Sequence, residues 1–122
     1  MSHIVEVKTM CRDPATVAAA CLRLGIPEPT RGTATLYSGQ AEGLLVKLPG
    51  WRYPAVVDTA TGAVRHDHFG GRWGDPAKLG RFLQAYAVEK ATAEARRQGH
   101  TVAERALPNG SILWSITVGG GA

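Results

Sequence analysis

Residue types that carry chemistry are most concentrated in the segment VRHDHFGGRWGDPA, residues 64–77. Its two histidines, His66 and His68, are two positions apart, and on a strand such residues lie on the same face. Both imidazoles could therefore bind one metal ion, but a site needs a third ligand, and Asp67 between them points to the other face. We treat His66 and His68 as weak metal candidates. We expect two solvent-facing histidines on a half-exposed strand, with no metal and no cofactor.

Other catalytic signatures are missing from the sequence. Cys11 and Cys21 show no CxxC spacing and no evident neighbouring base, and Cys21 falls on the inward stripe of an expected helix. The sequence also contains no nucleophile elbow around a serine, no phosphate-binding GxxxxGK and no GxGxxG after a strand. We therefore predict that the protein is not an enzyme.

Two segments place aromatic residues beside arginines. Trp51, Arg52 and Tyr53 lie in one expected loop, and Arg72 and Trp73 lie in another. Such pairs stack on nucleic-acid bases or anchor protein–protein interfaces, although they also serve to cover the open end of a small sheet. The resulting candidates for a binding surface are Tyr37, Gln40, Trp51, Arg52, Asp67, Arg72 and Trp73.

Tyr37 and Gln40 flank Gly39 at the end of an expected strand. Gly39 predicts a turn with positive φ, which glycine adopts without a steric penalty. In such a turn the Gln40 amide can bond to exposed backbone groups, and Tyr37 can pack its ring and leave its hydroxyl at the rim.

Length and charge limit the function classes. The chain has 122 residues, with 14 Lys and Arg against 10 Asp and Glu, which gives a net charge of +4. This mildly basic balance allows nucleic-acid binding, although there is no polybasic tract. No apolar run approaches the roughly 20 residues of a membrane helix, and residues 1–8 do not resemble a secretion signal. We expect a cytoplasmic protein that does not enter a membrane and keeps its cysteines reduced.

Two helices with the same kind of start divide the expected strands. Asp13-Pro14 and Asp75-Pro76 each combine an N-capping carboxylate with a proline at the first helical position. The first helix should end at Gly25 and bury Val17, Ala20, Cys21 and Leu24; the second should run to Gln98, end at Gly99 and bury Leu79, Phe82, Leu83 and Tyr86. Expected strands are residues 3–10, which should be buried, and 34–38, 43–48, 55–58, 63–69, 101–107 and 111–118.

This order, β-α-β-β-β-β-α-β-β, predicts an α+β fold. We expect a single, mostly antiparallel sheet with two helices packed on one face. The repeated DPA word, with strands after each helix, is compatible with a pseudo-duplication or with coincidence, because Asp-Pro is a common helix start. We predict one domain over residues 1–118 and a flexible glycine-rich tail over 119–122.

Several short motifs together resemble a domain-of-unknown-function family. The motifs are the Met-Ser-His start, Tyr37-Ser-Gly-Gln40, Leu48-Pro-Gly50, Asp67 with a nearby aromatic residue, Tyr86-Ala87, the helical Ala91 and Ala95, Gln98-Gly-His-Thr-Val102 and Asn109-Gly-Ser-Ile112. The family includes a conserved hypothetical protein of plastid and cyanobacterial genomes. The resemblance covers nearly all of residues 1–118, and its specificity lies in the order and spacing of the motifs. The chain departs from the family pattern in its His-x-His and in its glycine tail.

The resemblance implies a small α+β protein without an assigned reaction, some of whose relatives are encoded beside ATPases of the AAA class. We therefore predict a non-catalytic protein-interaction or adaptor module, whose partner could be an AAA-class ATPase. The alternative is a nucleic-acid-binding module that uses the basic surface and the Trp/Arg loops. A third alternative is a ubiquitin-like modifier, since the chain ends in Gly-Gly-Gly-Ala. A ubiquitin-like fold would begin with a hairpin, whereas this sequence begins with a strand and a helix.

Overall fold

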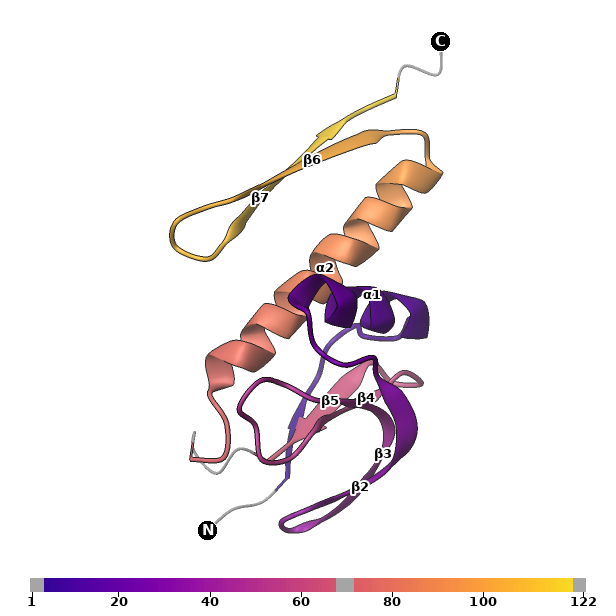
Figure 1. The fold of residues 1–122 in the computed structure, drawn as a ribbon. Helices are drawn as coiled ribbons and strands as arrows, with labels where there is room; N and C mark the ends of the chain where they lie inside the picture. The colour runs from indigo at the N-terminus through magenta and orange to yellow at the C-terminus, as the bar shows by residue number, and fades with distance from the viewer. Residues whose placement is uncertain (1–3, 68–71, 120–122) are drawn as a thin grey trace. The chain divides into compact units, whose positions relative to one another are not determined.

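A computed structural model of the chain describes residues 4–67 and 72–119. The expected α+β class and element order are confirmed (Figure 1). The elements are β1 Val5–Val7, α1 Pro14–Leu24, β2 Thr30–Leu36, β3 Gly39–Val46, β4 Ala55–Asp58, β5 Ala63–His66, α2 Pro76–Arg97, β6 Thr101–Ala106 and β7 Ile112–Thr117. The chain divides into two compact units, Met1–Tyr86 and Ala87–Ala122, and α2 belongs partly to each. The single domain predicted over residues 1–118 stays a prediction.

The first unit is built on a five-stranded sheet in the order β1-β5-β4-β3-β2, and every neighbouring pair is antiparallel. Residues 3–10 were expected to form a buried strand, but β1 has only three residues and pairs with β5 alone. Val5 is 40% exposed, because an edge strand has a neighbour on one side only. Expectation and structure therefore differ both in the length and in the burial of this strand.

One face of the five-stranded sheet carries the main core. Both α1 and the first half of α2 pack on it, as expected for two helices on one face. The sheet contributes Leu44, Val46, Val57 and Val64, and the helices contribute Val17, Ala20, Cys21, Leu79, Phe82, Ala85 and Tyr86. The hydroxyl of Tyr86 also accepts a hydrogen bond from the backbone N–H of Asp13, at 3.1 Å. This bond connects the first half of α2 to the residue that caps the start of α1.

The helix starts follow the capping chemistry of the sequence. A carboxylate oxygen of Asp13 accepts a hydrogen bond from the N–H of Ala15, and Asp75 does the same for Ala77, at 3.1 and 3.0 Å. Gly25 ends α1 in the left-handed conformation, with φ of 69°. α2 ends at Arg97, one residue earlier than expected. Neither described helix is long and apolar enough to cross a membrane.

The opposite face of the sheet is covered by a smaller cluster of Ala34, Leu36, Ala41 and Val56. Three of these residues belong to the β2–β3 hairpin, which curls in Figure 1, and Val56 belongs to β4. The hairpin turn consists of Tyr37 and Ser38, because Leu36 pairs with Gly39. The turn expected around Gly39 is therefore wrong: Gly39 begins β3 and is not among the glycines with positive φ.

The second unit contains a two-stranded sheet of β6 and β7, so the expected single sheet is divided in two. The hairpin turn at Pro108-Asn109-Gly110 is where the sequence predicts it. The indole Nε1 of Trp114 donates a hydrogen bond to the hydroxyl of Thr92 at 2.9 Å, which attaches the hairpin to the second half of α2. The N–H of Gly119 donates to His100 Nδ1 at 2.9 Å, and tail residues 120–122 lie outside the described residues.

Alanine substitutions at two glycines test how backbone conformation affects the stability of the fold. Gly62 has φ of 84° and its position for a Cβ is filled by the carbonyl of Thr9, so Gly62→Ala should lower the free energy of unfolding by more than about 1 kcal/mol. Gly80 lies within α2 with open space around it, so Gly80→Ala should raise the free energy of unfolding by about 0.5 to 1 kcal/mol. Chemical denaturation of both variants checks the pair, and effects of the same sign would contradict it.

Candidate functional site

Three separate segments of the first unit bring aromatic rings together. Tyr37 comes from the β2–β3 turn, Tyr53 from the loop between β3 and β4, and Trp73 from the segment before α2. The ring centroids of Tyr37 and Trp73 lie 5.0 Å apart, and those of Tyr53 and Trp73 lie 5.4 Å apart in an edge-to-face arrangement. Both separations are in the range where aromatic pairs attract each other. With Arg52, these residues form what we call the aromatic–arginine cluster.

Arg52 joins the cluster through both its side chain and its backbone. Its guanidinium carbon lies 5.7 Å from the ring centroid of Tyr53 and 5.4 Å from that of Trp73. A cation over an aromatic face at such distances contributes about 0.5–1 kcal/mol at an exposed site. The backbone N–H of Arg52 also donates a hydrogen bond to the carbonyl of Trp73 at 2.7 Å. The two loops that carry the cluster are therefore fixed to each other.

Trp51 supports the cluster from the interior side of the same loop. Its Nε1 donates a hydrogen bond to the carbonyl of Asp75 at 3.0 Å, and its ring lies edge-on to His66 at 5.6 Å. A Cβ on Gly74 would lie 2.5 Å from the Trp51 ring, so only glycine lets the chain pass this close. Trp51 is half-buried and packs on the main core. These contacts give Trp51 a structural role, and its predicted role in binding stays a prediction.

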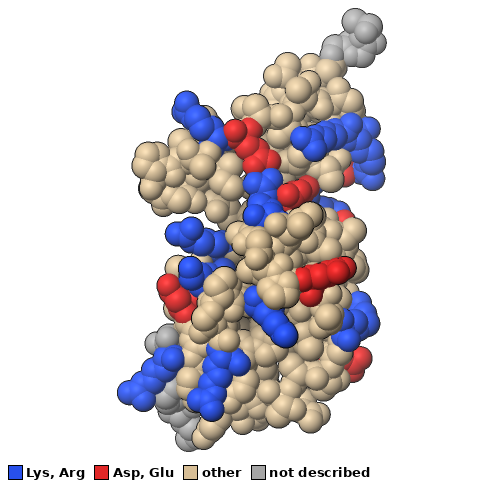
Figure 2. All heavy atoms as spheres, viewed as in Figure 1, with Lys and Arg blue, Asp and Glu red and all other residues tan. Residues whose placement is uncertain are grey.

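The cluster combines fixed rings with an exposed tip. Tyr53 and Trp73 are half-buried, whereas Tyr37 is 62% exposed and Arg52 and Arg72 are exposed. Figure 2 shows Lys and Arg side chains dispersed over the visible face, with Asp and Glu side chains between them. The cluster thus offers a phenol hydroxyl, a guanidinium and aromatic surface to a ligand.

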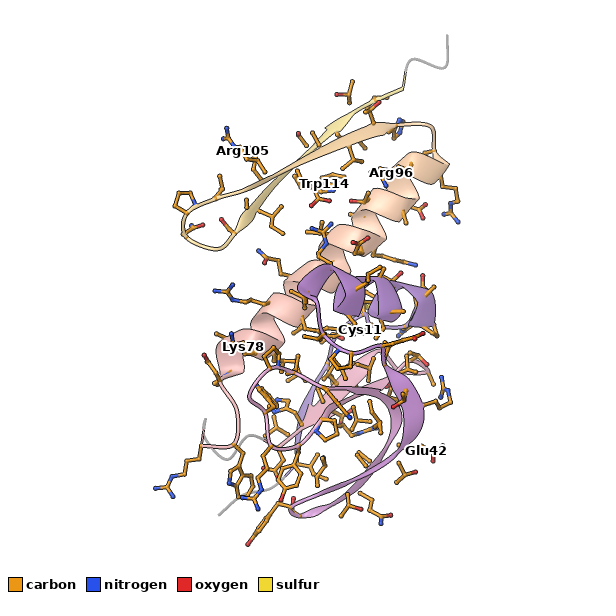
Figure 3. All side chains as sticks on the ribbon, viewed as in Figure 1. Cys11, Glu42, Lys78, Arg96, Arg105 and Trp114 are labelled. Atoms are coloured by element: carbon orange, nitrogen blue, oxygen red, sulfur yellow. The ribbon has the colours of Figure 1, made fainter. Side chains whose placement is uncertain are left out.

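Other predicted site residues lie elsewhere. Gln40 is separate from the cluster and lines an open hollow of about 440 Å³ with Arg31, Glu42, Asp58 and Arg65. Figure 3 shows the side chain of Glu42 on the outer side of β3. Arg65 is 3.5 Å from the carboxylate of Asp58 and 3.7 Å from that of Glu6, so the hollow combines both signs of charge. The sequence gives no sign of this hollow, because its residues come from four separate segments.

His66 at the end of β5 and Asp67 directly after it differ most from expectation. His66 is 3% exposed and Asp67 is 1% exposed, so His66 is not solvent-facing and Asp67 is not on a surface rim. His68 lies outside the described residues. Among residues 4–67 and 72–119, no group of three or more His, Cys, Asp or Glu residues is arranged to hold a metal ion.

One member of the cluster, Tyr53, was not among the predicted site residues. Its signal in the sequence is its position directly after Trp51-Arg52, in the same aromatic and basic segment. The contact between Tyr37 and Trp73 had no such signal. These residues are far apart in the chain, and the fold brings their ring centroids to 5.0 Å from each other.

The two cysteines are free thiols, and both are buried in the main core. Figure 3 shows Cys11 beside α1. Burial raises the pKa of the Cys21 thiol from 9.0 to about 11, because a thiolate loses its hydration in the core. Burial also raises the pKa of Cys11, against the opposing hydrogen bond with Thr9. Since the thiolate is the nucleophilic form, neither residue is suited to covalent catalysis.

Comparisons with models of known protein families, with curated proteins and with solved structures returned no match to this chain. The resemblance to a domain-of-unknown-function family therefore stays a prediction.

The raised pKa of Cys21 predicts a loss of stability at high pH. The folded state keeps this thiol protonated, so its contribution is complete below pH 9.0 and is lost as the pH rises towards about 11. The free energy of unfolding of the wild type should fall more steeply across this interval than that of Cys21→Ala. Denaturant titrations at both ends of the interval check the difference, and equal slopes would contradict the assignment.

Trp51 and Tyr37 should differ in their effect on stability. Trp51→Ala removes a half-buried ring and its hydrogen bond to Asp75, and should lower the free energy of unfolding by about 2 kcal/mol or more. Tyr37→Ala should cost less than about 1 kcal/mol, because the residue is mostly exposed. Thermal or chemical denaturation measures both, and a larger loss for Tyr37→Ala would make Tyr37 a structural residue.

Proposed function

We propose that the protein is a non-catalytic interaction module that binds another protein through the aromatic–arginine cluster. The observation that carries the proposal is the meeting of Tyr37, Arg52, Tyr53 and Trp73 from three separate segments, with Tyr37 62% exposed. Tyrosine, tryptophan and arginine are the residues that contribute most often to the energetic centres of protein interfaces. The buried, protonated thiols of Cys11 and Cys21 support a role without covalent chemistry.

The rigidity of the cluster favours binding. The Trp73 ring contacts the rings of Tyr37 and Tyr53 and the Arg52 guanidinium. The backbone N–H of Arg52 also donates a hydrogen bond to the backbone carbonyl of Trp73. Side chains that are already held in place lose little conformational entropy when a partner docks on them. Tyr37 adds contact area at low entropic cost, because a tyrosine has only two side-chain torsions.

The same contacts favour a protein over a nucleic acid. A base would need an open aromatic face on which to stack. The ring of Trp73 is contacted by Tyr37, Tyr53 and Arg52, so Tyr37 presents most of the exposed ring surface. A protein partner needs less: an acidic side chain for Arg52, an acceptor for the Tyr37 hydroxyl, and apolar groups beside the rings. An AAA-class ATPase in the cytoplasm, which the family resemblance suggests, is one partner that we include in the proposal.

The proposal predicts that two exposed cluster residues control partner capture. Tagged wild type and the variants Tyr37→Ala and Arg52→Ala are used for affinity purification from the native host, with quantitative mass spectrometry. Each variant should lower recovery of the specific partner at least about tenfold, the effect of an interface residue worth about 1.4 kcal/mol or more.

Arg81→Ala is the matched control, because Arg81 is an exposed arginine on α2 that has no contact in the cluster. It should leave recovery unchanged. Thermal melts of all three variants test whether they remain folded. Equal recovery of the partner by wild type and both cluster variants would contradict the proposal.

Nucleic-acid binding remains a second candidate, since the net charge of +4 and the exposed Arg52 and Arg72 suit a phosphate backbone. It is tested with single-stranded DNA and RNA oligonucleotides at low ionic strength. Binding through phosphates weakens steeply as salt is added, because counterions are released. Salt-dependent binding that Tyr37→Ala and Arg52→Ala abolish would favour this candidate over a protein partner.

A further inference from the structure

The two-stranded sheet of the second unit has open edges. Within residues 87–119, β6 pairs with β7 and neither strand has a second neighbour. An open edge presents unpaired N–H and C=O groups, which form a template for another strand. An isolated two-stranded ribbon is only marginally stable in water, so additional strands would stabilise this one beyond its attachment to α2.

The two edge strands differ in how strongly they oppose pairing with another chain. β6 carries Glu104 and Arg105 at its centre, and charged residues on an edge strand oppose pairing with another chain. β7, Ile112–Thr117, contains no charged residue. Three apolar side chains in or directly after β7 are also exposed: Leu113 is 47%, Ile116 41% and Val118 69% exposed. The edge of β7 is therefore the one that is open to pairing.

The hydrogen-bond pattern of the hairpin shows which groups of β7 lie on this open edge. The N–H of Leu107 donates to the carbonyl of Ser111 at 2.9 Å, next to the turn. In an antiparallel pair the bonded positions alternate, so Leu113, Ser115 and Thr117 direct their backbone groups towards β6. Ile112, Trp114 and Ile116 direct theirs outwards.

The side-chain faces follow from the same alternation. Ile112, Trp114 and Ile116 share one face of the ribbon. Figure 3 shows Trp114 on the side of the hairpin that faces the second half of α2, and Arg105 on the opposite side. The outward backbone groups thus belong to the apolar residues of the ribbon.

We propose that β7 pairs antiparallel with β7 of a second copy of this chain, around a twofold axis at Ser115. In this register Trp114 lies opposite the partner's Ile116, and Ile112 lies opposite the partner's Val118. Both pairs use outward backbone groups, and both place apolar side chains side by side. The two ribbons then form a four-stranded sheet with the order β6-β7-β7-β6, in which the charged β6 strands form the edges.

The strand itself argues for a second copy as its partner. With no charge in β7, no like charges face each other across the paired strands, and a twofold axis makes each favourable pair twice. The proposal is independent of the aromatic–arginine cluster, which belongs to the first unit. Tyr37→Ala should therefore dimerise like the wild type.

Oligomeric state is measured by analytical ultracentrifugation over a concentration series. The wild type should pass from one chain to two as concentration rises. Ile116→Lys places two cations next to the dimer axis and should raise the dissociation constant at least about tenfold. Ala103→Lys is the control, because it adds the same charge to exposed β6, one strand removed from the proposed β7–β7 contact. A wild type that stays monomeric, or a dimer that both variants affect equally, would overturn the proposal.

Disulfide trapping tests the register without depending on a disruptive variant. Ser115 faces its own copy as a non-hydrogen-bonded pair, whose Cα atoms lie about 4.5 Å apart in antiparallel sheets, within disulfide range. Ser115→Cys should give a covalent dimer when dissolved oxygen oxidises it with a copper–phenanthroline catalyst. Leu113→Cys, two positions from the axis, should not. The native cysteines are buried and do not compete. Equal crosslinking of the two variants would show that this register is wrong.

Discussion

The packing of Trp51 against the bare backbone of Gly74 is the contact on which the first unit's surface depends. It holds the loop between β3 and β4 against the segment before α2, and the Trp51 indole N–H completes it through the carbonyl of Asp75. Asp75 is also the N-cap of α2, so the same contact places the start of the helix. The helix in turn contributes Leu79, Phe82, Ala85 and Tyr86 to the main core. This contact thus connects the aromatic–arginine cluster to the core.

The two halves of the cluster have different physical roles. The half-buried rings of Tyr53 and Trp73, with the Arg52 guanidinium across them, form a fixed base. Tyr37 extends from a two-residue turn and is mostly in water, so its ring contributes little to folding. A large exposed aromatic residue on a fixed base is compatible with a binding surface, because exposed apolar area has no benefit to the free monomer.

Local chemistry explains what the sequence could predict. Asp13 and Asp75 cap their helices through side-chain bonds to residues two positions ahead, and the Pro-Asn-Gly turn defines the last hairpin. Long-range packing explains what it could not. The burial of Asp67, the separate sheet of β6 and β7, and the contact of Tyr37 with Trp73 all depend on residues distant in the chain. The position of the β2–β3 turn was predicted wrongly, because Gly39 was expected to adopt a positive φ. In the structure Gly39 begins β3.

The three tryptophans of the chain are divided between the two units: Trp51 and Trp73 lie in the first, and Trp114 lies in the second. Their surroundings differ. Trp51 packs on the backbone of Gly74, Trp73 contacts two tyrosine rings, and Trp114 donates a hydrogen bond to the Thr92 hydroxyl. Indole emission depends on such surroundings. Each unit therefore carries its own intrinsic optical reporter, and a chain that retains only Trp114 would report on the hairpin alone.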